Sequence, residues 1–115
     1  MYNVYFLAQL WKETCDDRLE NKKLKREWTK NPDDKYSVTD NFVENTKKNK
    51  FMSVKSKEEG NHMVELDSKN NRDTKSQTWT KSDNDEDGYF TLTNPHYNKL
   101  LTAKKQDKWT LEGML

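Results

Sequence analysis

Apolar residues along this chain come in short runs, and several of these runs alternate with polar residues. Residues 36–39, Tyr-Ser-Val-Thr, and residues 89–93, Tyr-Phe-Thr-Leu-Thr, alternate in this way. A period of two is typical of a strand that buries one face. The segments with strand character are residues 4–11, 36–39, 51–54, 62–66, 89–93, 100–103 and 108–111. Clusters of Asn, Asp, Lys and Gly separate them, so the pattern predicts an all-β barrel or sandwich with polar turns.

Helical periodicity is weak throughout the chain. The best helix candidate covers residues 14–25, where Asp16 and Asp17 stand near the start, as helix first turns prefer. Leu19 and Leu24 are its only aliphatic residues, so it has no apolar stripe to bury. We expect an exposed loop or a single turn in this segment.

An internal repeat is the more informative feature. Trp28-Thr29-Lys30 recurs as Trp79-Thr80-Lys81, and acidic residues follow both copies. Residues 36–40 then correspond to residues 90–94, residues 49–55 correspond to residues 98–104, and each copy finishes with a strand. Such ordered similarity indicates a repeated structural unit. The repeat divides one domain, residues 1–115, into the tail of a first copy (1–27), a second copy (28–78) and a third copy (79–115).

This arrangement resembles the ricin-B-like β-trefoil lectins, and also the fascin-type trefoils. The hallmark of the former family is Gln-x-Trp, present here as Gln77-Thr78-Trp79, and residues 87–94 with 99–103 are the closest match. In that family three repeats close a barrel capped by three hairpins. The resemblance implies a β-trefoil-like fold that is incomplete, with two full repeats plus the tail of a first. Open strand edges of an incomplete barrel would favour self-association.

The resemblance implies a non-catalytic carbohydrate-binding module, not an enzyme. Its candidate ligand-binding residues are Gln77, Asn94, Tyr97, Asn98 and Thr102. Sugar-binding repeats carry an Asp after the Lys-x-Leu-type strand, where this chain has Ser53 and Thr102. That departure favours an alternative, a protein-interaction or structural trefoil that has lost the sugar site. The expected partner is therefore a glycan or another protein.

Composition limits the size of the core and the class of partner. Of the 115 residues, 30% are hydrophobic and 36% are charged, and the net charge is +1. The four Trp, five Tyr and four Phe compensate, because aromatic side chains bury a large area each. Lys and Arg are interspersed with Asp and Glu, so we expect no basic face and no nucleic-acid partner.

The acidic run before Gly88 has the alternating carboxylates of a calcium loop. Asp83, Asp85 and Asp87 take the first, third and fifth positions, and Gly88 takes the sixth. The twelfth position is Asn94, where a calcium loop has Glu. We therefore expect a solvated acidic turn and no metal site, with the three Asp residues as the candidate ligands of the less favoured calcium loop.

The remaining reactive residues are scattered, so we expect no cofactor. Cys15 is alone and cannot form an intrachain disulfide. His62 and His96 have no carboxylate or nucleophile at a recognisable catalytic spacing. No signal peptide is evident and no apolar stretch could span a membrane, which predicts no membrane partner and favours the cytoplasm.

Overall fold

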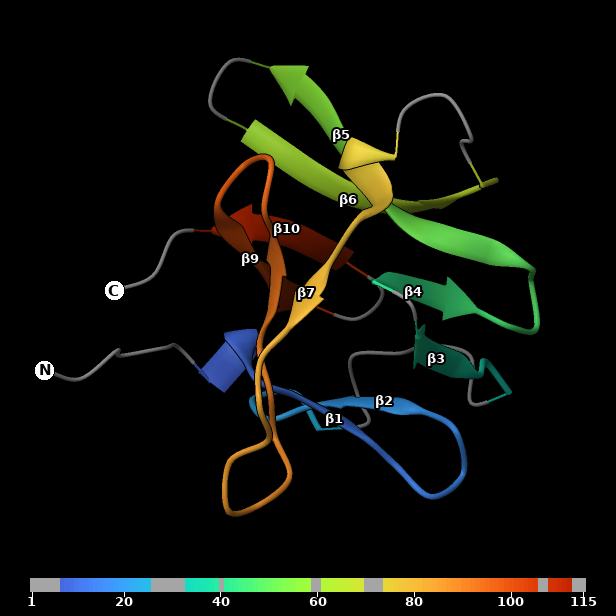
Figure 1. Ribbon diagram of the computed structural model, residues 1–115, viewed down its shortest axis with the longest axis vertical. Helices are drawn as coiled ribbons and strands as arrows, with labels where there is room; N and C mark the ends of the chain where they lie inside the picture. The colour runs from blue at the N-terminus through green and yellow to red at the C-terminus, as the bar shows by residue number, and fades with distance from the viewer. Residues whose placement is uncertain are drawn as a thin grey trace, which may run out of the picture.

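The computed structural model describes residues 7–25, 33–39, 41–58, 61–69, 74–105 and 108–112. Strands account for most of these residues (Figure 1): β1 (Trp11–Glu13), β2 (Leu19–Asn21), β3 (Tyr36–Thr39), β4 (Phe42–Asn45), β5 (Lys50–Glu58), β6 (Asn61–Asp67), β7 (Thr80–Lys81), β8 (Leu92–Asn94), β9 (Lys99–Lys105) and β10 (Lys108–Glu112). Within the described residues two short 3-10 helices accompany them, η1 (Leu7–Gln9) and η3 (Lys75–Gln77). The predicted all-β fold class is confirmed.

Eight of the strands form one curled antiparallel sheet, a half-barrel compatible with a β-trefoil-like fold. Its order is β3-β4-β5-β6-β10-β9-β8-β7, and β1 pairs with β2 in a separate sheet. The seam between β6 and β10, where Trp109 faces Val64, joins the two long hairpins β5/β6 and β9/β10. Among the described residues no helix is long and apolar enough to cross a bilayer.

Three short hairpins, β1/β2, β3/β4 and β7/β8, share one register. Each places an aromatic residue opposite an Asn at the end of the second strand. In the third hairpin Thr80 faces Thr93, and the same register continued by one residue sets Trp79 opposite Asn94. The facing pairs are Trp11–Asn21, Tyr36–Asn45 and Trp79–Asn94. Two residues before each Asn stands a buried aliphatic side chain, namely Leu19, Val43 or Leu92. The structure therefore contains three copies of one hairpin.

The turn after each hairpin is also the same. The Asn side-chain oxygen accepts hydrogen bonds from the backbone N–H groups two and three residues later, at 3.0 to 3.2 Å. Four residues after the Asn the backbone takes a positive φ, at Lys25 (55°), Asn49 (54°) and Asn98 (53°). Asn is suited to this turn position because its side-chain oxygen accepts hydrogen bonds from the nearby backbone and so stabilises the turn.

Hydrogen bonds between the hairpins form a closed ring. The backbone N–H of each facing aromatic residue donates to a carbonyl of a neighbouring hairpin. Trp11 donates to Phe90 of β7/β8 (2.9 Å), Tyr36 to Asp17 of β1/β2 (2.7 Å) and Trp79 to Asn41 of β3/β4 (2.8 Å). Each acceptor lies four residues before the Asn of its hairpin. We call these three hairpins the cap ring. The described residues thus hold a complete cap ring over a barrel wall built from two long hairpins.

Two tryptophans link the cap ring to the core. Trp11 and Trp79 are 0% and 1% exposed. Their indole N–H groups donate to the carbonyls of Leu101 (3.0 Å) and Met52 (3.1 Å). Leu101 lies seven residues after Asn94, and Met52 lies seven residues after Asn45. The two indoles therefore occupy equivalent places. A buried indole with its donor bonded adds large apolar area without leaving a polar group unsatisfied.

The structure corrects several local expectations. Residues 14–25 were expected to be an exposed loop or single turn, and this expectation is wrong: they contain β2, with Leu19 only 2% exposed. Within residues 4–11, a predicted strand, the described part is η1 followed by Trp11 at the start of β1. Strand β4 was not predicted. Trp28, the proposed counterpart of Trp79, lies outside the described residues, so that equivalence stays a prediction.

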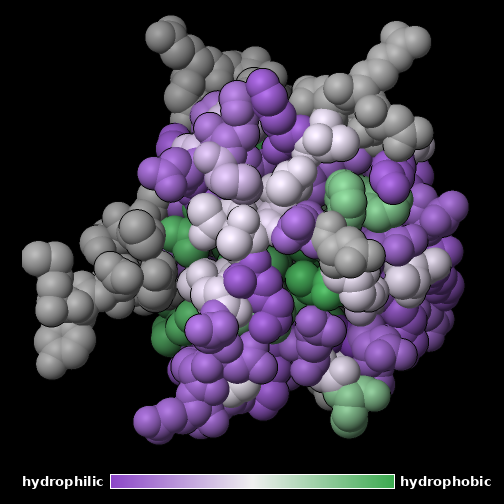
Figure 2. All heavy atoms as spheres, viewed as in Figure 1, coloured by the Kyte–Doolittle hydropathy of each residue, from purple (hydrophilic) through white to green (hydrophobic). Residues whose placement is uncertain are grey.

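The surface reflects the charged composition. Hydrophilic residues cover most of the face shown in Figure 2, and the apolar residues that reach this face form small, separate patches. Leu7 is the large apolar side chain that stands out among the described residues, at 52% exposure. We therefore look for binding sites in pockets and not on a broad apolar face.

Candidate functional site

The Gln-x-Trp motif occurs twice in the described structure. Besides Gln77-Thr78-Trp79 there is Gln9-Leu10-Trp11, and both glutamines end a 3-10 helix and are buried. Gln9-Leu10-Trp11 was not identified from the sequence as a copy of the motif, because the repeat aligns Trp28 with Trp79. The Gln-x-Trp pattern itself occurs at both places in the sequence and is the signal that identifies this copy.

Gln77 acts as a structural tie in this fold. Its side-chain nitrogen donates to the hydroxyl of Ser53 (2.8 Å) and to the carbonyl of Ser68 (2.8 Å). Helix η3 thereby contacts β5, as η1 contacts β9 in the other Gln-x-Trp unit. These bonds satisfy the buried side-chain amide of Gln77, which would destabilise the fold if it had no hydrogen-bond partner.

Ser53 and Thr102 occupy equivalent positions, eight residues after the Asn of their hairpins. Both hydroxyls donate to the carbonyl two residues earlier, Ser53 to Phe51 at 3.2 Å and Thr102 to Leu100 at 3.1 Å. Both side chains are buried, at 2% and 3% exposure. They differ in surroundings, because Ser53 also accepts the Gln77 amide whereas Thr102 lines a pocket.

The structure separates the five predicted ligand residues into two groups. Asn94, Tyr97 and Asn98 share the turn after β8, and Asn94 also donates to the carbonyl of Lys75 (2.9 Å), which joins this turn to η3 of Gln77. Tyr97 is half-buried, with the rings of His62 and His96 4.7 and 4.9 Å from its own. Asn98 is exposed. Thr102 stands apart on β9, in a pocket that none of the other four lines.

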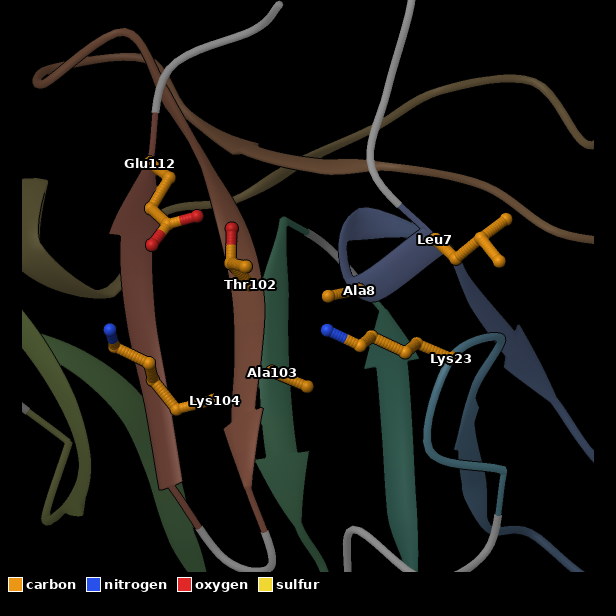
Figure 3. Close-up of a pocket in the computed structure, with 7 residues that line it drawn as sticks. All are labelled: Leu7, Ala8, Lys23, Thr102, Ala103, Lys104 and Glu112. Carbon is orange, nitrogen blue, oxygen red and sulfur yellow. The ribbon is translucent and has the colours of Figure 1, made fainter.

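This pocket, which we call the β9 pocket, encloses about 450 Å³. Its lining comes from η1, the turn after β2, β9 and β10 (Figure 3), namely Leu7, Ala8, Lys23, Thr102, Ala103, Lys104 and Glu112. Lys23 reaches toward β9 from the turn, and Glu112 bends over β10 toward Thr102. Elements from both ends of the chain therefore build one site.

The β9 pocket combines hydrogen-bond donors and acceptors with two alanine methyl groups. Ala8 and Ala103 are buried and supply methyl groups. The Thr102 hydroxyl can still accept hydrogen bonds, because its proton is donated to Leu100. Lys23 and Lys104 carry ammonium donors, and Glu112 carries a carboxylate acceptor. Its volume lies within the roughly 300–1,000 Å³ of small-molecule sites.

The acidic turn is exposed and organised by its own backbone. Residues 83–87 are all exposed. The Asp85 carboxylate accepts the N–H groups of Tyr89 and Asp87, both at 2.9 Å, and the Tyr89 bond is the main reason that the pKa of Asp85 is lowered. Among the described residues, no three His, Cys, Asp or Glu side chains are grouped closely enough to hold a metal ion. Asp83, Asp85 and Asp87 belong to the described residues and do not form such a group.

Comparison with protein-family models, with curated proteins and with solved structures finds no match to this chain. The resemblance to ricin-B-like trefoils therefore rests on the motifs of the sequence.

Proposed function

We propose that this protein is a non-catalytic carbohydrate-binding module and that the β9 pocket is its saccharide site. The observation that carries the proposal is the place of Thr102. It holds the position at which sugar-binding repeats carry their sugar-contacting Asp, and it lies in a pocket of about 450 Å³ lined by Lys23 and Glu112.

The chemistry of the pocket suits a sugar ring. A pyranose presents an apolar C–H face and a rim of hydroxyl groups that each donate and accept. Ala8 and Ala103 offer a floor for the apolar face. An ammonium group and a carboxylate can bond neighbouring hydroxyls, and hydrogen bonds to charged groups are the stronger ones. Lys23 and Glu112 supply this pair.

We expect one such site per chain. The equivalent residue in the other Gln-x-Trp unit, Ser53, is as buried as Thr102, but its hydroxyl already accepts the Gln77 amide at 2.8 Å. A ligand there would have to displace a buried bond within the protein. Thr102 lines an open pocket instead.

A glycan array followed by calorimetric titration of its hits tests the proposal. Binding should be saturable and competed by the free saccharide. Lys23→Met and Glu112→Gln should each weaken it about tenfold or more, because each removes a hydrogen bond to a charged group. Lys47→Met is the matched control, since Lys47 takes the position of Lys23 in the turn after β4 and does not line the pocket. A flat array, or equal losses in Lys23→Met and Lys47→Met, would refute the proposed site.

The second candidate is a protein-interaction or structural trefoil. The neutral hydroxyl of Thr102 favours it, because a hydroxyl makes weaker bonds to sugar hydroxyls than the carboxylate it replaces. The edge strands of the half-barrel are short, with four residues in β3 and two in β7, which limits strand pairing with another chain. Light scattering of the purified protein measures whether self-association occurs.

A further inference from the structure

A second pocket lies on another part of the half-barrel, and we propose that it binds a small organic cation, an alkylammonium or guanidinium group with an apolar body. The pocket encloses about 270 Å³ and is bounded by the start of β3, the turn after β4, β6 and β10. Asp34, Tyr36, Lys48, Glu65 and Trp109 carry the argument. We call it the β6 pocket, and it shares no lining residue with the β9 pocket.

Asp34 is the reason to expect a cation. Its side chain is only 4% exposed, yet it lines the pocket. One carboxylate oxygen lies 3.5 Å from the ammonium nitrogen of Lys48, and the other is buried with no hydrogen-bond partner in the described part of the chain. Buried charges are normally paired and hydrogen-bonded, so this oxygen retains an unmet need for a donor.

The walls of the β6 pocket would favour the apolar body of such a ligand. Tyr36 and Trp109 are 5% and 8% exposed, and both residues line the pocket. Aromatic faces attract cations, more strongly where water is excluded. Glu65 on β6 adds a second carboxylate to the lining. One carboxylate at depth, another at the side and aromatic walls match an amine better than an anion or a sugar.

Lys48 already shows how a cation approaches Asp34. It reaches the carboxylate from the turn after β4, and its own side chain is 49% exposed. Lys48 is half exposed and can return to water, and a ligand ammonium that takes its place keeps the buried charge of Asp34 paired. A ligand ammonium would therefore compete with Lys48 for Asp34, and the small volume restricts that ligand to the size of a simple amine.

The chain carries its own control one residue away. Asp33 and Lys47 form the neighbouring ion pair at 3.6 Å, with exposures of 77% and 48%. Asp33 does not line the β6 pocket, and neither does Lys47. Substitutions in this exposed pair change the net charge as much as those in the Asp34–Lys48 pair, so the two sets separate pocket binding from surface attraction.

The test is a calorimetric and NMR titration of the full chain with 2-phenylethylamine, with 2-phenylethanol as the uncharged probe of similar shape. We expect saturable binding of the amine and little binding of the alcohol. Asp34→Asn should weaken amine binding about tenfold or more, since it removes the buried charge, whereas Asp33→Asn should change it little. Lys48→Met should strengthen binding by removing the competing cation, and Lys47→Met should not.

Several results would overturn this proposal: no saturation by the amine, equal binding of the alcohol, or equal losses in Asp33→Asn and Asp34→Asn. Tryptophan fluorescence during urea unfolding checks that each variant is folded. If Asp34→Asn does not fold, the comparison of Lys48→Met with Lys47→Met decides, because an unchanged or weakened affinity in Lys48→Met contradicts competition at Asp34. Lys23→Met should leave amine binding unchanged, which separates this site from the saccharide site.

Discussion

Three asparagines repeat one set of bonds, with one difference among them. Asn21, Asn45 and Asn94 are each 0% exposed and each accepts two backbone N–H groups of its turn. The side-chain nitrogens of Asn21 and Asn94 also donate, to the carbonyls of Ala8 (2.8 Å) and Lys75 (2.9 Å). That of Asn45 is buried without a partner among the described residues. The hairpin with this Asn begins at Tyr36, which is not preceded by Gln-x-Trp.

Alanine at the three positions should reveal this difference. We expect Asn21→Ala and Asn94→Ala to lower the free energy of unfolding by about 2–3 kcal/mol each, because both the turn bonds and the link to the 3-10 helix are lost. Asn45→Ala should cost about 1 kcal/mol less, since its amide donor makes no bond that the change could remove. Urea unfolding monitored by tryptophan fluorescence measures all three. Equal losses would show that the link to the 3-10 helix contributes nothing.

Elements with long alternating or apolar runs were predictable, and elements with a single buried position were not. Strands β5, β6, β9 and β10 contain predicted segments and β3 matches its prediction, because several core residues stand in each run. Strands β2 and β4 bury mainly one aliphatic residue each, Leu19 and Val43, between polar neighbours. Their strand state depends on pairing and on the cap ring, which local sequence preferences do not show.

The hairpin loops explain why the first Gln-x-Trp was overlooked. The Asn follows the facing aromatic residue by ten, nine and fifteen positions in the three hairpins. A comparison at nearly constant offset therefore pairs Trp79 with Trp28 instead of Trp11. The β9 pocket was predictable only at Thr102. Lys23 and Glu112 come from elements far from it in sequence and join it only through the fold.

A buried tyrosine joins two of the hairpins. Tyr89, before β8, is 7% exposed, and its hydroxyl donates to the carboxylate of Glu20 on β2 at 2.9 Å. The ammonium groups of Lys12 and Lys22 lie 5.4 and 5.0 Å from its ring centre. Burial, followed by the bond to Glu20, raises the pKa of Tyr89 above its ordinary value. Its neutral form is therefore the form that the folded state favours.

This shift predicts a loss of stability in alkali. A folded-state pKa above the unfolded value, about 10 for tyrosine, gives stability that is complete below that value and is lost as pH rises through the higher folded pKa. Tyr89→Phe should remove this part of the decline while costing some stability at pH 7. Urea midpoints of both proteins between about pH 8 and 11 measure it. Glu20→Gln should lower the pKa of Tyr89, and parallel pH profiles for wild type and Tyr89→Phe would contradict the argument.

At the scale of the whole molecule, aromatic residues replace the aliphatic mass that the chain lacks. Only 30% of its residues are hydrophobic. Trp11 and Trp79, each almost fully buried, pack in one cluster with Met52, Leu92 and Leu101. The cap ring contributes residues to this cluster, and its backbone bonds run from hairpin to hairpin and return to the first. Core and ring are therefore built cooperatively, from segments distant in sequence.

The cap ring is closed, so no hairpin in it has to be the first. The chain could therefore begin and end at another point of the ring. Helix η1 packs on β9 as η3 packs on β5, and η1 lies on the same side of the molecule as the end of β10 (Figure 1). Seven residues, 68–74, connect β6 to η3. Joining residue 115 to residue 1 would place nine residues between β10 and η1, which is enough by the same measure.

A circular permutant with joined ends, reopened within the exposed residues 83–87, should therefore fold with the same hairpins. Exposed loop tips tolerate such cuts, and ends that lie close together favour them. Circular dichroism and urea unfolding should show a cooperative transition close to that of the original chain. A permutant reopened inside β5, between Ser53 and Val54, cuts a buried strand and should not fold. If both permutants failed, the order of the elements along the chain, and not the ring alone, would determine this fold.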